Sequence, residues 1–225
     1  MSESDWSGAT EEKKFRLDGD IFIKSSLREE EWQCHHETGE KYQPKMSIER
    51  AKNEAANLRF IREHTSIPVP RVLYECENHG AYTIAMTRAK GVTMDTLSPP
   101  EKVIVMAKMQ PYFDSFHRLK SSKLGGVSGL ICPPHPVLNK VPYEKCQWAP
   151  KSILSDLYVF CHMDAHQENI FVDPETLDIT CIIDFEFAGF YPQDFDLPLY
   201  KYERSQLPDR SDFAEEFLQF LNTYW

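Results

Sequence analysis

The sequence predicts an α+β protein of two lobes: a small, β-rich N-lobe and a mainly helical C-lobe that contains a hairpin with polar loops. Three observations predict it. Short apolar runs separated by turn residues dominate residues 14–88. Longer segments with helical apolar spacing dominate residues 89–225. Within the second part, two short apolar runs are flanked by Asp and Asn. We expect a flexible N-terminus over residues 1–13, before the two lobes.

The N-lobe is predicted to hold two strand pairs and one helix. Residues 15–24 are typical of a strand, a turn at Gly19 and a second strand. Residues 72–74 and 82–86 predict another pair, joined by a turn at 78–80. Between the pairs, helical spacing predicts a helix that ends near His64, before two prolines. Its apolar positions are Ile48, Ala51, Ala55, Leu58 and Ile61.

The C-lobe is predicted to hold two long helices. Residues 91–100 form a connector, and an amphipathic helix follows over 103–119. Residues 121–151 are rich in Gly and Pro and favour an ordered loop over a helix. A closing helix spans 212–225. Its apolar face contains Phe213, Phe217, Phe220 and Leu221.

Composition excludes several classes of function. The chain has 225 residues, 25 of them basic and 35 acidic, for a net charge of −10, which disfavours DNA or RNA as a partner. Neither a secretory signal nor a membrane span is expected. Six cysteines without a C-x-x-C pair indicate reduced thiols and a cytoplasmic location. The Cys34-His35-His36 cluster is more typical of a surface loop than of a zinc site. The oligomeric state stays open.

One motif indicates phosphoryl-transfer chemistry. His162, Asp164 and Asn169 form an H-x-D-x-x-x-x-N loop, and Asp184 follows an apolar run and precedes Phe. We expect Asp164 to orient an acceptor hydroxyl and take its proton. Asn169 and Asp184 are the candidate Mg²⁺ ligands. His162 is a further candidate catalytic residue that more often braces such a loop. The alternative, a hairpin with acidic flanks, is rarer in this strand context.

A phosphotransfer site also needs a cation for the nucleotide phosphates. Lys24 follows a short apolar strand and is the candidate, with Glu54 on the first helix as its partner. Glu49 and Glu63 are alternative partners, and a surface lysine is the alternative role for Lys24. The 18–20 turn contains the one glycine of the expected phosphate loop, between two aspartates that would face the phosphates.

These residues resemble the aminoglycoside phosphotransferase/choline kinase-like family, which has a protein-kinase-like fold, and most closely its fungal kinase-like members. The resemblance lies in residues 53–63, 67–73, 91–97, 124–126, 160–164 and 182–192. It implies ATP, Mg²⁺, a small-molecule hydroxyl acceptor and a hinge whose backbone contacts adenine. The hinge residues are Met86, Thr87 and Arg88, continuing to Lys90. A short segment before His162 argues against carrying over aminoglycoside specificity.

The expected function is ATP- and Mg²⁺-dependent transfer of a γ-phosphate to a hydroxyl group of a small molecule. The alternative is a pseudokinase, or a kinase fold used for binding or for other biosynthetic chemistry. Two further features have open interpretations. Glu186 either contacts a substrate amine or is solvated. The aromatic residues either line an acceptor pocket or belong to the core. They are Phe190, Tyr191, Phe195 and Tyr200.

Overall fold

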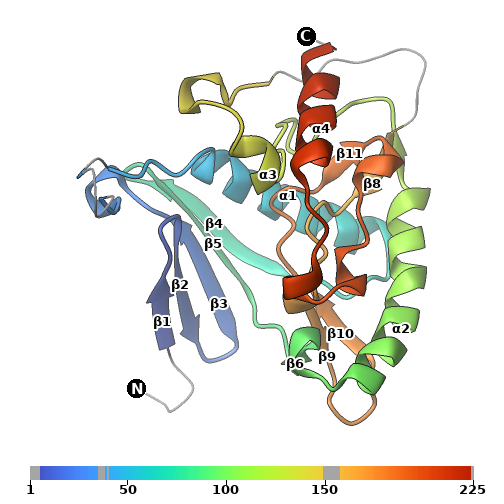
Figure 1. Ribbon diagram of the computed structural model, residues 1–225. Coiled ribbons are helices and arrows are strands. Elements are labelled where there is room, and N and C mark those ends of the chain that lie inside the picture. The colour runs from blue at the N-terminus through green and yellow to red at the C-terminus, as the bar shows by residue number, and fades with distance from the viewer. Residues whose placement is uncertain (1–5, 35–38, 40, 149–157, 224–225) are drawn as a thin grey trace.

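A computed structural model describes residues 6–34, 39, 41–148 and 158–223 (Figure 1). The strands are β1 (Trp6–Ala9), β2 (Lys13–Asp18), β3 (Ile21–Ser26), β4 (Val72–Asn78), β5 (Ala81–Thr87), β6 (Val92–Thr93), β7 (Lys120–Ser121), β8 (Tyr158–Cys161), β9 (Ile170–Val172), β10 (Ile179–Ile182) and β11 (Gly189–Tyr191). The helices are α1 (Ser47–His64), α2 (Pro99–Arg118), α3 (His135–Leu138) and α4 (Ser211–Thr223). The predicted α+β class, with a β-rich N-terminal part and a helical C-terminal part, is confirmed.

The N-terminal part is one antiparallel sheet in the order β1-β2-β3-β5-β4. The predicted strand pairs β2–β3 and β4–β5 both form, and β3 joins them by pairing with β5. The β4–β5 turn has positive φ at His79 and Gly80, as a tight hairpin requires. In contrast to the expected loose N-terminus, Trp6–Ala9 pairs with β2 as the edge strand. The lobe boundary near residue 88 stays a prediction.

Helix α1 packs against β3, β4 and β5 of this sheet and lies between it and the C-terminal part (Figure 1). Its predicted apolar face is buried, with Ala55, Leu58 and Ile61 fully covered. The same helix also buries polar side chains, which the apolar pattern did not predict. They are Arg50, Asn53, Glu54 and Asn57. Buried polar groups are stable only with partners, so this face marks a place where the helix meets other polar structure.

Two small sheets and two long helices make up the C-terminal part. Strands β10-β9-β6 form one sheet and β11-β8-β7 the other, and α2 packs against β8 and β10. The predicted 103–119 helix begins earlier, at Pro99, because Ser98 and Glu101 form a capping box there. Strand β6 lies within the expected 91–100 connector.

The 121–148 stretch is mostly loop, as predicted, and contains the single-turn helix α3. Residues 149–151 lie outside the described part. Helix α4 buries Phe217 and Leu221, while Phe213 and Phe220 pack at the edge around Phe195. Phe190, Tyr191 and Tyr200 are also buried in the core, so these aromatic residues pack rather than line an open acceptor pocket.

Other sequence expectations have simple outcomes. All six cysteines are free thiols. The backbone of Cys34 forms an isolated antiparallel β-bridge with Lys41. His35 and His36, the rest of the metal-like cluster, lie outside the described residues. Among the described helices, none has the length and apolarity needed to cross a membrane.

Candidate active site

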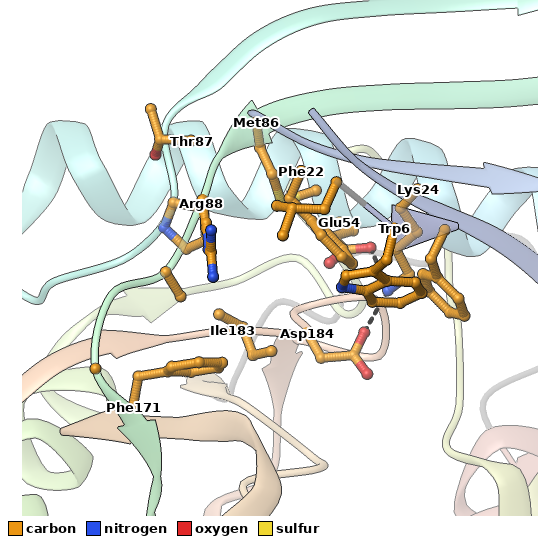
Figure 2. Close-up of a pocket in the computed structure, with 15 residues that line it drawn as sticks. Trp6, Phe22, Lys24, Glu54, Met86, Thr87, Arg88, Phe171, Ile183 and Asp184 are labelled. Carbon is orange, nitrogen blue, oxygen red and sulfur yellow. Dashed lines mark hydrogen bonds and ion pairs between the residues drawn. The ribbon is translucent and has the colours of Figure 1, made fainter. Parts of the chain in front are cut away.

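A cavity of about 320 Å³ lies between the N-terminal sheet and the C-terminal part (Figure 2). Met86 and Phe22 bound it on the sheet side, and Phe171 and Ile183 bound it on the opposite side. Arg88 lies toward one end of the cavity, and charged side chains gather at the other. The cavity thus combines a flat apolar slot with a charged end, which is the usual composition of a site for a ligand with an apolar body and a polar group.

Lys24 is the centre of the charged end. Its Nζ lies 2.7 Å from Glu54 Oε2 and 2.5 Å from Asp184 Oδ1, as the dashed lines in Figure 2 mark. The lysine and the helix carboxylate that the sequence paired therefore do meet. Glu49 and Glu63, the alternative partners, are not among the contacts of Lys24. Burial alone would lower the pKa of Lys24, but the charges of Asp184, Glu186 and Glu54 outweigh it and raise that pKa well above its usual value.

A second set of charges lies behind Lys24. Glu186 is 1% exposed, and its Oε2 contacts the ammonium groups of both Lys13 and Lys24. Its Oε1 lies 3.7 Å from Nη1 of Arg50, and Arg50 in turn binds Glu12 at 2.6 Å. Burial would raise the pKa of Glu186, but the three cations hold it well below its usual range. Glu186 is therefore neither solvated nor open to a substrate amine, in contrast to both earlier interpretations.

Glu54 shows the opposite electrostatic balance. Burial raises the pKa of its carboxyl to about 7, since the attraction of Lys24 is opposed by the nearby charges of Asp184 and Glu186. Carboxylate oxygens of Glu54, Asp184 and Glu186 all lie within 4.8 Å of one another. Three carboxylates so close together need cations, which Lys24 and Lys13 supply here.

Backbone hydrogen bonds join the H-x-D loop to the loop of Asp184. The N–H of Ile183 donates to the carbonyl of Asn169, and the carbonyl of Ile183 accepts from His162 Nε2 at 3.1 Å. Asn169 Nδ2 donates to the Asp164 carbonyl at 2.8 Å. The other amide atom, Oδ1, can act only as an acceptor or a metal ligand. The residue next to Ile183 is Asp184, with φ +68. These bonds therefore place Asn169 beside the Asp184 backbone.

The contacts of His162 are those of a residue that braces the loop, and its catalytic role stays a prediction. Its side chain is fully buried, and Nδ1 accepts from the N–H of Asp164 at 3.3 Å while Nε2 donates to Ile183. Burial lowers the pKa of His162, so the neutral imidazole is favoured. Both ring nitrogens are engaged with backbone groups, and neither reaches the cavity.

Asp164 remains partly open to solvent, with 20% of its side chain exposed. His166 Nε2 lies 3.1 Å from its Oδ1. Burial would raise the pKa of Asp164, but the hydrogen bond and charge of His166 outweigh it, so the pKa is lowered. An ionised carboxylate at this position can accept a hydrogen bond from an incoming hydroxyl group. His166 also lines a separate cavity of about 190 Å³ with Asp95 and Tyr202.

Two asparagines of α1 hold the segment after Asp184. Asn53 Nδ2 donates to the carbonyls of Glu186 and Ala188, and Asn57 Nδ2 donates to those of Phe185 and Ala188. Gly126 packs against this clamp so closely that a Cβ there would lie 1.8 Å from Asn53 Oδ1. The helix that carries Glu54 thus also fixes the loop that carries Asp184.

The segment expected to be the hinge lies at the end of the cavity away from Lys24. Met86, Thr87 and Arg88 all line the cavity. The N–H of Thr87 donates to the Arg71 carbonyl, and the N–H of Arg88 donates to the Asp20 carbonyl. A purine base would therefore use other backbone groups of this segment.

The Asp18-Gly19-Asp20 turn does not lie at the charged end, which corrects the expected phosphate loop. In the strand register Ile21 pairs with Thr87, so this turn lies at the hinge end. The side chains of Asp18 and Asp20 are 57% and 85% exposed. The turn at the Lys24 end is instead 10–12, which joins β1 to β2. The two aspartates therefore do not oppose a phosphate group.

The oxygen atoms of the two candidate Mg²⁺ ligands are of the kind that this ion prefers. Asp184 supplies a carboxylate that faces the cavity, with 29% of its side chain exposed, and Asn169 supplies an amide oxygen whose partner nitrogen is already engaged. Mg²⁺ prefers such oxygen ligands, few from the protein and the rest from phosphate and water. A second cluster of potential metal ligands consists of His117, Cys161 and Asp196. Both carboxylate oxygens of Asp196 already accept hydrogen bonds from the protein, one from His117 and one from the Met163 N–H.

Sequence reasoning missed several residues of this site. Lys13 shares a strand face with Phe15 and Leu17, a period-two pattern that could have revealed it. Asn53 and Asn57 are spaced i, i+4 beside the apolar stripe of α1, which also could have been noticed. Trp6 lines the cavity but lies in the segment expected to be loose. Arg50 has no such signal, because its pairing with Glu186 depends on the tertiary fold.

A comparison with protein families identifies part of this arrangement. Residues 143–223 match a family model described as the phosphotransferase enzyme family. The resemblance found in the sequence is therefore confirmed, and the matched stretch contains the H-x-D loop and Asp184. A closer relation to fungal members stays a prediction. A search of curated proteins found no match.

Solved structures share the fold over almost the whole chain. An aminoglycoside phosphotransferase, APH(3'')-Id from Streptomyces rimosus, is 16% identical with a TM-score of 0.60, covering 96% of this chain and 85% of its own. Its complex with ADP and streptomycin is 18% identical with a TM-score of 0.61, covering 96% and 84%. An aminoglycoside-3'-phosphotransferase of type VIII is 17% identical with a TM-score of 0.58, covering 97% and 87%. The chain therefore has the kinase-like fold of these proteins.

Proposed function

We propose that this protein is a phosphotransferase that uses ATP and Mg²⁺ to move the γ-phosphate to a hydroxyl group of a small molecule. The observation that carries the proposal is the meeting of Lys24, Glu54 and Asp184 at the charged end of an apolar slot. Phosphoryl transfer requires mainly positioning and neutralisation of charge, and these residue types supply both. The family match over residues 143–223 supports the same reaction class.

The nucleotide would lie with its base between Phe22 and Met86 on one side and Phe171 on the other. Its phosphates would then extend toward Lys24, which would exchange its contact with Asp184 for a phosphate oxygen while Glu54 holds its position. Asp184 and Asn169 would hold Mg²⁺. That ion would neutralise charge on the phosphate oxygens.

In the transfer step, the oxygen of the acceptor hydroxyl forms a bond to the γ-phosphorus. The bond between that phosphorus and the oxygen bridging to the β-phosphate breaks, and its electron pair leaves with ADP. Asp164 orients the hydroxyl and takes its proton. His166 keeps the Asp164 carboxylate ionised and in place. His162 holds the two loops in register through their backbone groups.

The reaction can be tested by product analysis with purified protein, ATP and Mg²⁺, and a panel of small hydroxyl compounds. We expect ADP and a phosphorylated acceptor. Asp164→Asn and Asp184→Asn should each lower the rate at least about 10²-fold, because one removes the base and the other a metal carboxylate. Asp173→Asn is the matched control, since Asp173 is a half-buried residue just before the turn of the same hairpin and Asn retains its Asx turn.

Other products would contradict the proposal. Pyrophosphate in place of ADP would indicate nucleotidyl transfer by a repurposed kinase fold. Tight nucleotide binding with no turnover across the panel, and equal behaviour of the wild-type and Asp164→Asn proteins, would indicate a pseudokinase.

A further inference from the structure

Lys13 lies on the strand face that also contributes two apolar residues to the cavity, and its ammonium group contacts Glu186 next to Lys24. Lys13, Phe15 and Leu17 alternate along β2, and the last two line the cavity. Lys13 is 8% exposed. Its neighbour Lys14 points to the other face of the sheet, where its side chain is 40% exposed and pairs with Glu31. Only the first of these adjacent lysines therefore faces the charged end.

The ammonium groups of Lys13 and Lys24 converge on one oxygen atom. Both contact Oε2 of Glu186, Lys24 at 3.3 Å, and Lys24 also contacts Asp184. Two cations gathered at one anionic oxygen, beside a candidate metal carboxylate, form the charge arrangement that a phosphate oxygen would meet. Lysine binds phosphate as a point charge, so neither ammonium requires a special approach direction.

Lys13 is the first residue after the turn that joins β1 to β2. The 10–12 turn, Thr-Glu-Glu, joins β1 to β2 at the Lys24 end of the sheet and contains no glycine. The side chain of Glu12 pairs with the fully buried Arg50. The turn therefore supplies no cradle of the glycine-rich type, and Lys13 is its nearest inward cation.

We propose that Lys13 is a second phosphate-binding residue, which leaves Glu186 when the nucleotide binds and contacts the terminal phosphates together with Lys24. This inference rests on the proposed function. Glu186 would stay compensated by Arg50, and Asn53 would keep its backbone in place. A side-chain cation thereby takes the part that glycine amides have in other phosphate loops.

Calorimetric titration of adenosine, AMP, ADP and ATP with Mg²⁺ tests this role. Lys13→Met should weaken the binding of ATP and ADP about tenfold or more and leave adenosine binding unchanged. Lys14→Met is the matched control and should behave as wild type. Equal ATP binding by Lys13→Met and wild type would overturn the inference, as would a loss of the same factor for adenosine, which would indicate a structural role only.

A second pair of variants covers the case that Lys13→Met does not fold because Glu186 loses a partner. Glu186→Gln retains Lys13, and the double variant Lys13→Met/Glu186→Gln removes the charges together. The double variant should bind ATP about tenfold more weakly than Glu186→Gln, and equal binding would refute the role of Lys13. If the wild-type protein binds none of the four ligands, the proposed function itself fails, and this inference fails with it.

Discussion

At the charged end of the cavity, most ion pairs meet at two atoms, Glu186 Oε2 and Lys24 Nζ. Each of these atoms contacts at least two oppositely charged groups, and each residue is nearly fully buried. Removing one partner of such a set leaves an uncompensated buried charge, which is costly. Substitutions of Lys24 or Glu186 are therefore expected to lower the stability of the fold as well as to change the site.

His162 should make the stability of the fold sensitive to acid. Its pKa is lowered by burial, so below about pH 6.5 the unfolded imidazole takes up a proton before the folded one does. Stability from this group is full above that pH and is lost as the pH falls. The Tm difference between about pH 7.5 and about pH 5.5 should shrink in His162→Asn. His79→Asn, in an exposed turn, should leave that difference unchanged, and a result in which both variants match wild type would contradict the assignment.

Asn57 is fully buried and should contribute strongly to stability. Asn57→Ala removes the donor to the Phe185 and Ala188 carbonyls and the acceptor for the Val127 N–H. We expect a loss of about 1–3 kcal/mol in the free energy of unfolding, measured with urea. Asn139→Ala, at an exposed position, should cost less than about 0.5 kcal/mol. Similar values for the two variants would show that the clamp does not stabilise the loop.

The residues with a fixed motif spacing could be predicted from the sequence. Asp164, Asn169 and Asp184 follow from the loop pattern, and Lys24 and Glu54 from a strand and a helix in the right order. Lys13 and Arg50 could not be assigned in this way. Their partner Glu186 lies more than a hundred residues away, and only the packing of β2 and α1 against the Asp184 loop brings the three together.

At the scale of elements, α1 connects the two halves of the site. One face of the helix packs on the sheet, while Glu54 reaches Lys24 and two asparagines hold the Asp184 loop. The periodicity of apolar residues predicted this helix to within one residue of its start, but it did not indicate the buried polar face. Strand β1 was missed because Trp6–Ala9 has only four residues, one of them Gly8, and its pairing with β2 defines it.

The contact between the loop at Gly125-Gly126 and α1 can be tested by adding one methyl group. Gly126→Ala should cost about 1–3 kcal/mol in unfolding free energy, because its Cβ would collide with Asn53 Oδ1. In the double variant Gly126→Ala/Asn53→Ala the obstructing amide is gone. Its cost should therefore be smaller than the sum of the two single costs, measured as a double-mutant cycle. Strict additivity would contradict the close contact.

The whole molecule places an apolar slot and a charged end between a β-rich part and a helical part. The sequence predicted the β-rich part followed by the helical part, because the order of strands and helices follows from local patterns. The position of the phosphate loop was not predictable from them. Two turns, 10–12 and 18–20, lie at opposite ends of the same strand. The register of β3 with β5 places the 18–20 turn beside Thr87, and the contacts of Glu12 and Lys13 place the 10–12 turn at the charged end.

Nucleotide binding by the intact protein tests the central claim most directly. We would measure Tm against ATP concentration, with and without Mg²⁺, for wild type and Asp184→Asn. At about 100 times Kd a ligand adds about 2.7 kcal/mol, which corresponds to a rise of about 5–10 °C for a chain of this size. We predict such a rise with Mg²⁺ for wild type and its loss in Asp184→Asn. No rise for wild type at millimolar ATP, or an equal rise in both proteins, would contradict a Mg²⁺-dependent phosphotransfer site.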